Sequence, residues 1–344
     1  MTSSDLVAGV LAREARSVAR AIRMVDDRLA GSAELLKALW EHTGKAWILG
    51  VTGNPGAGKS TLCDRLIEAY RGRGKRVGVV AVDPTSPYSG GAILGDRIRM
   101  SRHATDEGVF IRSLATRGHL GGLSHSARDV VRVLDASGHD VILVETVGVG
   151  QDELEVVRTA HSTVVVVTPG MGDGVQTSKA GILEFADVFA VNKADSDGAD
   201  STVRDLELML ALGREASRAQ PRGHGSHAAT DPASPERGRT ANDSWVPPIV
   251  KCVATRGEGT SALMAALDEH RAWVEGTQAG QDRTQIRLAE EVRETLREAL
   301  IDAAVTDLGT TIDAAVHEVA ARITDPYTAT ERLVEAFRAA RKSR

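Results

Sequence analysis

GNPGAGKS, residues 53–60, directly follows the apolar run WILGVT at 47–52 and directly precedes the helical pattern TLCDRLIEAY at 61–70. It matches the pattern GxxxxGK[ST], whose glycines let the backbone curl so that successive N–H groups point at phosphate oxygens. The start of the following helix adds partial positive charge at the same place. We therefore expect a phosphate-binding loop made of Gly53, Asn54, Pro55, Gly56, Ala57, Gly58, Lys59, Ser60 and Thr61.

Within this loop, two side chains carry the chemistry of a nucleoside triphosphate site. The ammonium group of Lys59 can reach the β- and γ-phosphates, and the hydroxyl of Ser60 can ligate Mg²⁺. The strand before the loop and the helix after it are the context that the motif requires, so the pattern is a strong indication of a nucleotide-binding P-loop.

A second motif, NKAD at 192–195, follows the apolar run VFAVN at 188–192 and predicts the base. The carboxylate of Asp195 can accept two hydrogen bonds from guanine, whereas adenine lacks that pair of donors and would leave a buried charge unpaired. Asn192 can contact the other edge of the base, and the stem of Lys193 can lie over the ring. Backbone groups of Val253, Ala254 and Thr255, at the end of the next apolar run, are expected to complete a pocket for GTP or GDP.

Acidic residues at the ends of two further runs predict a magnesium site. VILV at 141–144 is followed by Glu145, and Gly148 just beyond it could offer its N–H to the γ-phosphate. Asp83 and Asp96 bracket a glycine-rich segment after the run RVGVVAV at 76–82. Both could approach Mg²⁺ or the attacking water, although a turn or a helix cap explains such residues as well. The predicted metal ligands are thus Ser60, Asp83, Asp96 and Glu145, and the predicted catalytic residues are Lys59, Asp83 and Glu145.

Val149 follows Gly148 at the position where many regulatory GTPases carry the glutamine that orients water. Gln151 lies two residues further on. We therefore expect slow intrinsic hydrolysis that a partner or a second copy of the chain accelerates.

The fold follows from short β-branched runs that alternate with helical segments. Near-continuous apolar runs of this kind are typical of a parallel sheet covered on both faces, whose ligands bind at the carboxyl ends of the strands. We predict an α/β P-loop NTPase fold with a mostly parallel sheet and helical extensions at both ends of the chain. The expected strands are 47–52, 76–83, 109–114, 141–146, 164–168, 188–192 and 248–254.

Three regions lie outside this alternation, and they set the predicted domains: an extension at 1–45, a GTPase domain at 46–275 and a helical arm at 276–344. Apolar residues at helical spacing between Ser3 and His42 predict two helices broken near Gly31, which we interpret as a packing appendage. Residues 213–247, rich in Gly, Pro, Ser, Ala and Arg, are predicted to be a flexible insertion, and His224 and His227 within it lack the fixed geometry of a metal site.

The C-terminal pattern predicts helices at 260–275, 284–305, 309–323 and 326–340, with Asp325 as a cap before Pro326. Two interpretations of this arm stay open. It could pack on the same core, or it could be an oligomerisation arm.

Composition excludes several classes of protein. The 344 residues are 42% apolar with a formal net charge of −5, so no basic field predicts a nucleic-acid or membrane-surface binder. Cys63 and Cys252 form no CxxC pair, which suits a reducing compartment. No apolar run reaches the length of a signal peptide or a transmembrane segment. We expect a cytoplasmic protein.

Taken together, these segments resemble the MeaB/ArgK family of GTPases, which includes the methylmalonic aciduria type A protein. The resemblance runs from about Trp47 to Phe337, apart from 213–247. It rests on GNPGAGKSTL, VDPTSPYSGGAILGDRIRM, ETVGVGQDE, PGMGDGVQTSKAGILEFADVFAVNKAD and DPYTATERLVEAF. The segments ETVGVGQ and DPxSxxSGGxxLGD are not general features of GTPases.

The resemblance implies a homodimeric chaperone of a cobalamin-dependent acyl-CoA mutase, with its adenosyltransferase as a further partner. Such a protein uses GTP to gate adenosylcobalamin delivery and to protect or reactivate the mutase. It also implies that Asp83, Asp96 and Glu145 form the acidic Mg²⁺ set. The loop with Asp173, Gln176 and Lys179 is similar to an additional switch that relays the nucleotide state to the mutase.

Three alternative functions make different demands on the sequence. A nucleotide-dependent kinase would need a base pocket suited to ATP, and NKAD argues against it. A metallochaperone GTPase for a nickel or zinc enzyme would need Cys or His clusters at ligand spacing, and the sequence has none. A binding-only module that has lost hydrolysis would differ in single-turnover phosphate release.

Overall fold

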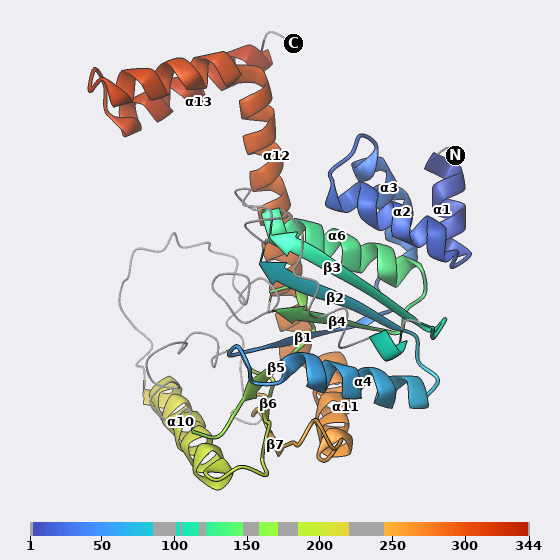
Figure 1. The fold of residues 1–344 in the computed structure, drawn as a ribbon. Coiled ribbons are helices and arrows are strands. Elements are labelled where there is room, and N and C mark those ends of the chain that lie inside the picture. Colours follow the sequence, from blue (N-terminus) through green and yellow to red (C-terminus); the bar gives the residue numbers. More distant parts are fainter. Residues whose placement is uncertain are drawn as a thin grey trace. The chain divides into compact units, whose positions relative to one another are not determined.

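The computed structural model describes residues 3–84, 101–103, 105–116, 122–146, 158–170, 185–219 and 244–342 of the chain (Figure 1). The chain divides into two compact units, Met1–Thr284 and Gln285–Arg344. The first unit holds the sheet, and the second is helical. The finer division into 1–45, 46–275 and 276–344 stays a prediction.

A seven-stranded parallel sheet forms the centre of the first unit, as predicted. Its strands follow one another in space in the order β3-β2-β4-β1-β5-β6-β7, and every neighbouring pair is parallel. Because the chain passes from β4 on one side of β1 to β5 on the other, a crevice is expected at the carboxyl end of β1, where the phosphate loop begins. The strands are β1 (Trp47–Gly53), β2 (Val77–Pro84), β3 (Val109–Thr116), β4 (Val141–Thr146), β5 (Ser162–Val167), β6 (Val188–Val191) and β7 (Ile249–Lys251).

The predicted and observed strands agree to within a few residues, and the largest difference is at β7. The run at 248–254 forms a ladder only over Ile249–Lys251. Val253 instead pairs with Glu258 in an isolated antiparallel bridge. The chain therefore leaves the sheet after Lys251 and turns back on itself between Val253 and Glu258.

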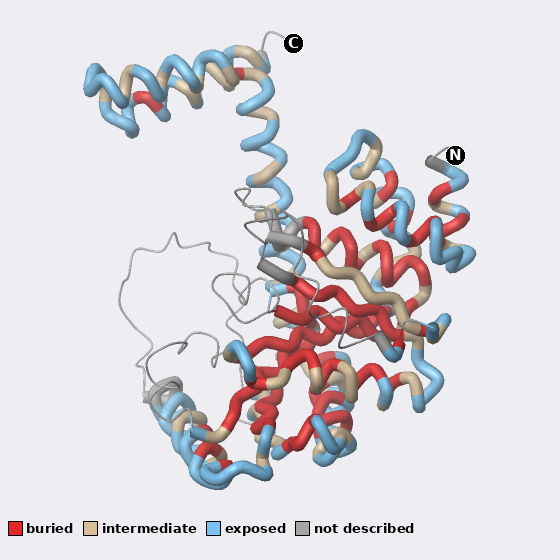
Figure 2. The backbone as a smooth tube through the Cα atoms, in the orientation of Figure 1, coloured by how far each residue is buried: buried red, intermediate tan, exposed pale blue. Residues whose placement is uncertain are grey.

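Helices cover both faces of the sheet, and the buried residues gather along the strands between them (Figures 1 and 2). On one face, Leu49 and Val51 pack with residues of α4 (Lys59–Gly72) and α11 (Thr260–Gly276). On the other, Ile48 packs with residues of α6 (Gly122–Ala136). This alternation along β1 is the period of two that a strand buried on both faces must show. α10 (Ala199–Ala219) packs through Leu206 beside β5 and β6.

The N-terminal extension contains three α-helices where the sequence predicted two. They are α1 (Ser3–Leu11), α2 (Ala15–Asp26) and α3 (Ser32–Leu39), followed by the short 3₁₀ helix η1 (Trp40–His42). The additional break falls at Arg13, whose φ of +66° ends the first helix. A Cβ atom at Gly9 would lie 2.2 Å from Ser17 Oγ, so glycine there allows α2 to fold back closely on α1. The three helices share one buried cluster with α6.

A buried ionic cluster lies at the edge of the sheet where β5 and β6 begin. Asp187 is 2% exposed, and its carboxylate accepts hydrogen bonds from both terminal nitrogens of Arg283, at 2.5 and 2.8 Å, and from the backbone N–H of Thr163 at 2.8 Å. His270 Nε2 lies 3.3 Å from the same carboxylate, and burial lowers the pKa of His270 to about 4. The cluster thereby ties the first turns of the helix that carries Arg283 to β5 and β6.

That helix, α12 (Gln278–Ala320), is continuous, whereas the sequence predicted two helices at 284–305 and 309–323. Of its two glycines, Gly309 lies at the predicted break, and its cost of about 1 kcal/mol is not enough to end the helix. α13 (Pro326–Lys342) begins as predicted, because the Asp325 carboxylate accepts the N–H groups of Tyr327 and Thr328. In the second unit, Leu308 and Ala329 are buried.

Two further predictions concern segments at the surface. The predicted insertion at 213–247 starts later than expected, because α10 continues to Ala219, and residues 220–243 lie outside the described residues. Within the described ranges, no helix combines the length and the apolar character that a membrane crossing requires.

Candidate functional site

The phosphate loop leaves β1 at Gly53 and enters α4 at Lys59, as the motif predicts. Gly53 and Gly58 have φ values of +135° and +89°, which a residue with a Cβ rarely adopts. Close packing adds to this requirement. A Cβ at Gly53 would lie 2.1 Å from Val166 O, and one at Gly58 would lie 2.3 Å from Asn192 Nδ2. Glycine is therefore needed at both ends of the loop, where it meets β5 and the base-recognition motif.

Lys59 is buried and its side chain folds back along the loop. Its Nζ donates to Gly53 O at 2.8 Å and to Asn54 O at 3.1 Å. These bonds hold the ammonium group over the concave side of the loop, where the β- and γ-phosphates of a nucleotide would add anionic acceptors. The position fits the role predicted for Lys59.

Ser60 and Glu145 meet in the centre of the site. Ser60 Oγ donates a hydrogen bond of 2.5 Å to Glu145 Oε1, and the two residues are 7% and 3% exposed. Ser60 lies on the first turn of α4, and Glu145 lies near the end of β4, so the contact joins the start of this helix to the end of this strand. Two buried side-chain oxygens beside a phosphate loop are suitable ligands for a hard cation such as Mg²⁺. The longer glutamate, in place of the more usual aspartate, reaches the serine directly.

Asn192 ties the phosphate loop to the base-recognition loop at 253–258. Its Nδ2 donates to Ala57 O at 2.8 Å, and its Oδ1 accepts the N–H of Ala254 at 3.0 Å. Both polar ends of the side chain thus bind backbone. A direct contact between Asn192 and the base stays a prediction. The structure adds a role that the sequence did not indicate, because Asn192 holds the two loops together.

Lys193 and Asp195 lie at the tip of the same motif. Lys193 has a φ of +57°, so the chain turns sharply after β6. Asp195 is accessible, and its Oδ2 accepts a hydrogen bond of 3.2 Å from Arg256 Nη1. Arg256 is also bound by Glu258 at 2.7 Å. The carboxylate that is predicted to recognise guanine is therefore exposed at the mouth of the site and is held by a cation from the loop at 253–258.

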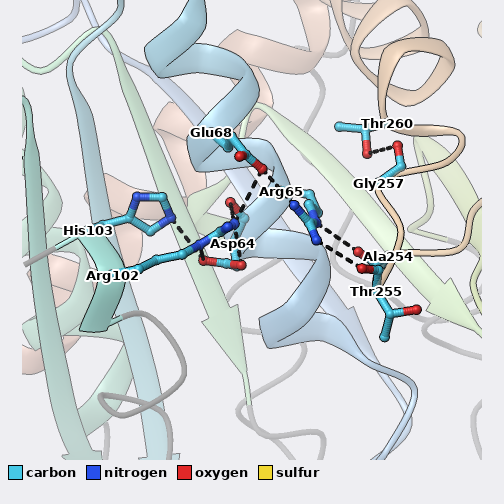
Figure 3. Close-up of polar contacts among 9 residues, drawn as sticks. All are labelled: Asp64, Arg65, Glu68, Arg102, His103, Ala254, Thr255, Gly257 and Thr260. Carbon is cyan, nitrogen blue, oxygen red and sulfur yellow. Dashed lines mark hydrogen bonds and ion pairs between the residues drawn. The ribbon is translucent and has the colours of Figure 1, made fainter.

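Arg65 is a site residue that the sequence did not single out (Figure 3). From the second turn of α4 its Nε donates to Ala254 O and its Nη2 to Thr255 O, both at 2.9 Å. Arg65 therefore anchors the loop that is predicted to contact the base to α4, the helix that follows the phosphate loop. An arginine inside an amphipathic helix gives no sequence signal for this role, because its partners are carbonyl groups almost 190 residues away.

The same helix is tied on its other side to the short 3₁₀ helix η2 (Ser101–His103) (Figure 3). The carboxylate of Asp64 accepts hydrogen bonds from Arg102 Nε at 2.7 Å and is 2.9 Å from His103 Nε2. α4 therefore connects the loop at 253–258 with the residues that follow the glycine-rich acidic segment.

Several predicted residues lie outside the described part of the chain. The backbone of Asp83 belongs to β2 and lies in register with Ala115 of β3, but its side chain is not described. The remaining ones in this group are Asp96, Gly148, Asp173, Gln176 and Lys179. Their roles stay predictions.

Comparison with known proteins agrees with this arrangement. A family model described as "Methylmalonyl Co-A mutase-associated GTPase MeaB" matches residues 18–308. A protein of Pyrococcus horikoshii that is named as a GTPase is 43% identical, over 96% of this chain and 97% of its own length. GTPase ArgK of Escherichia coli is 44% identical over 54% of this chain and 57% of its own.

Two further relatives extend the comparison. A fused isobutyryl-CoA mutase of Nocardia farcinica is 39% identical over 62% of this chain, which corresponds to 20% of that protein. A crystal structure named LAO/AO transport system kinase has a TM-score of 0.65 and 25% identity, and covers 98% of each chain. With a family model that spans most of the sheet-bearing unit and relatives named as GTPases, this chain is a P-loop GTPase that belongs to the MeaB family of methylmalonyl-CoA mutase-associated GTPases.

Proposed function

We propose that the chain binds and hydrolyses GTP with Mg²⁺ at this site, and thereby gates adenosylcobalamin loading and protects or reactivates a cobalamin-dependent acyl-CoA mutase. The observation that carries the mutase assignment is the relative of Nocardia farcinica in which a homologous segment is part of an isobutyryl-CoA mutase. Fusion of two activities in one chain is expected when they act on the same process. The family description, which links MeaB proteins to methylmalonyl-CoA mutase, supports the same assignment.

Each residue of the site has a chemical role in this proposal. Lys59 binds the β- and γ-phosphates, and backbone N–H groups of residues 53–60 surround them. Ser60 and Glu145 hold Mg²⁺, with Asp83 and Asp96 as further acidic groups. Mg²⁺ supplies charge neutralisation at the phosphates when it is bound. The 2.5 Å contact between Ser60 and Glu145 supports this pairing.

Exclusion of water and orientation of the nucleotide depend on the two loops that meet at Asn192. Arg65 and Asn192 hold the loop at 253–258 against the phosphate loop, so the base and the phosphates bind to one connected frame. Such preorganisation is the main contribution that a protein makes to phosphoryl transfer. We place the switch that reports the nucleotide state to the mutase in the loop with Asp173, Gln176 and Lys179.

The helices of the second unit support a homodimer. Apolar side chains on α12 and α13 are exposed, and an apolar helix surface of this kind is typical of a contact with another protein surface. We propose that a second copy of the chain covers it, with the mutase and its adenosyltransferase as further partners in the cytoplasm. The exposed residues on these helices include Val292, Leu296, Leu300, Ile301, Val305, Val316 and Val334.

Replacing Asp195 by asparagine is expected to change the base that the protein prefers. The amide presents a donor where the carboxylate accepts, so GDP should bind at least tenfold more weakly while xanthosine diphosphate gains affinity. Titration of the purified variant with both nucleotides measures the change. Asp197→Asn, an exposed neighbour in the same turn, is the control and should leave both affinities unchanged. An unaltered preference for guanine in the Asp195 variant would place the base elsewhere.

Association with a mutase can be tested directly. We expect the chain to co-purify with methylmalonyl-CoA, isobutyryl-CoA or 2-hydroxyisobutyryl-CoA mutase, with an affinity that differs between GDP and a non-hydrolysable GTP analogue. The correct mutase should also raise the GTPase rate several-fold. The Lys59→Ala variant should lose the nucleotide dependence of the complex. If none of these mutases changes the GTPase rate, the chaperone proposal is wrong, although the GTPase activity itself would stand.

The name of the structural relative raises the alternative of a kinase. A kinase that uses ATP would bind ATP at least as tightly as GTP. Competition between the two nucleotides for the site separates the alternatives, and our proposal expects GTP to displace ATP and not the reverse.

A further inference from the structure

A cavity of about 780 Å³ lies in the first unit at the edge of the sheet where β2 and β3 begin. The nucleotide site lies at the opposite edge, where the strands end. Five segments form the cavity walls: the turn between α1 and α2 with the start of α2, the residue before β2, the residues His103 and Thr105–Glu107 before β3, the start of β3, and the turn after α6. The residues that matter for its chemistry are Arg13, Arg76, Val18, Phe110, Ile111 and His139.

The guanidinium groups of the exposed Arg13 and of the half-buried Arg76 both line this cavity. Arg76 Nε is buried, and within the described residues it has no hydrogen-bond partner. Burial lowers the pKa of Arg76, and repulsion from Arg13 and Arg71 lowers it further, while attraction to Asp140 and Asp106 opposes part of this shift. The guanidinium of Arg13 packs closely against Gly138 in the turn after α6. A Cβ atom at Gly138 would lie 3.0 Å from both Nε and Nη2 of Arg13. In the part of the chain that the structure describes, neither arginine forms an ion pair.

The neighbouring carboxylates are mostly engaged elsewhere. Asp106 receives two hydrogen bonds of 2.8 Å from Arg71, and Asp140 is 3.3 Å from Lys75 Nζ. Glu107 lines the cavity as an exposed side chain. With Arg71 paired to Asp106 and Lys75 to Asp140, the two cavity arginines outweigh Glu107 and leave the cavity positively charged. A partly buried cation in such surroundings is costly unless an anion binds beside it.

The remaining walls are apolar or uncharged. Val18 and Ile111 contribute aliphatic surface, and Phe110 lies edge-on to His139, with ring centroids 6.3 Å apart. Burial lowers the pKa of His139 to about 4, so this imidazole is neutral near pH 7 and adds no positive charge. Cavities of this size with an apolar wall and a few polar groups are typical of sites for small organic ligands.

We propose that this cavity is a second ligand site that binds a small organic anion, with a carboxylate or phosphate group between Arg13 and Arg76 and an apolar, planar body against Phe110. The site is separate from the nucleotide site and does not depend on the function proposed for it. Arginine suits this role because its planar fork can bind either anion through two parallel hydrogen bonds.

The test uses the full chain saturated with GDP and Mg²⁺, so that the phosphate loop is already occupied. Benzoate and phenyl phosphate are the probes, and benzyl alcohol is the neutral analogue, each titrated by calorimetry. We expect one molecule of at least one anionic probe to bind per chain, with benzyl alcohol binding at least tenfold more weakly. The comparison between benzoate and phenyl phosphate shows which anion the site prefers.

Variants assign the binding to the cavity. Arg76→Gln and Arg13→Gln should each weaken the probe at least tenfold, whereas Arg20→Gln, on the exposed face of α2, should have no effect. The bound probe should raise the unfolding temperature of the unaltered protein and not that of Arg76→Gln. Because Arg76→Gln removes an unpaired cation, the variant should remain folded. Equal affinity in Arg76→Gln, or no saturable binding of either anion to the unaltered protein, would overturn the proposal.

Discussion

Replacing Lys59 by alanine should weaken the binding of GTP by roughly 10²–10³-fold, since hydrogen bonds to charged groups contribute about 1.5–3 kcal/mol each and about 1.4 kcal/mol is a factor of ten. In the structure the ammonium group is buried at the concave side of the phosphate loop, 2.8 Å from Gly53 O and 3.1 Å from Asn54 O. Alanine removes both the positive charge and these donors. The loss should be larger for GTP than for GDP, because the γ-phosphate is the group furthest from the other backbone donors.

Titration of the purified variant with GTP and GDP in the presence of Mg²⁺ measures this effect. Lys37→Ala, at an exposed position of α3, is the matched control and should bind both nucleotides as the unaltered protein does. Thermal unfolding should confirm that the Lys59 variant is folded. A folded Lys59→Ala protein with unchanged affinity for GTP would show that the phosphates bind at another place.

Replacing Arg283 by methionine should lower the free energy of unfolding of the first unit by about 3–5 kcal/mol, the usual cost of leaving a buried charge without its partner. Asp187 is 2% exposed and accepts two hydrogen bonds from Arg283. Without the guanidinium, the carboxylate keeps the N–H of Thr163 and the neighbouring His270. Asp187→Asn should cost less, because the arginine left behind is 39% exposed in its side chain and can be hydrated.

Urea unfolding followed by tryptophan fluorescence measures these changes, since Trp245 and Trp273 lie beside His270. Arg73→Met removes an exposed ion pair with Asp268 and should cost less than about 1 kcal/mol. The effect of Arg283→Met should also be smaller at pH 5 than at pH 8. The reason is that loss of the Arg283 charge removes one of the causes that lower the pKa of His270, so that at pH 5 a proton on His270 can compensate Asp187. Equal stability of the Arg283 and Arg73 variants would mean that the buried cluster contributes little.

The sheet could be predicted from the sequence because each of its strands is a short, nearly continuous apolar run. The phosphate loop could be predicted because its glycines and Lys59 form a fixed local pattern between a strand and a helix. Both signals are local. The pairing of Ser60 with Glu145 was also expected, since the carboxyl ends of parallel strands meet at one edge of the sheet.

What the sequence did not reveal depends on contacts between distant residues. Arg65 looks like any solvent-facing arginine of a helix until its carbonyl partners at Ala254 and Thr255 are seen. The third N-terminal helix was missed because the break at Arg13 carries no glycine or proline. The continuity of α12 was missed because Gly309 resembles a helix end. For Arg65 and the break at Arg13 tertiary packing decides the outcome, whereas at Gly309 the cost of one glycine is too small to end the helix.

The most direct test of the account is a crystal structure of the chain with GDP and Mg²⁺ bound. We expect Ser60 Oγ about 2.1 Å from the metal ion and the Asp195 carboxylate about 3 Å from the guanine N1 and N2 groups, with Arg256 moved away from Asp195. Guanine bound far from Asp195, or a metal ion without Ser60 among its ligands, would contradict the claim that the phosphate loop and the Asn-Lys-Ala-Asp motif form one nucleotide site.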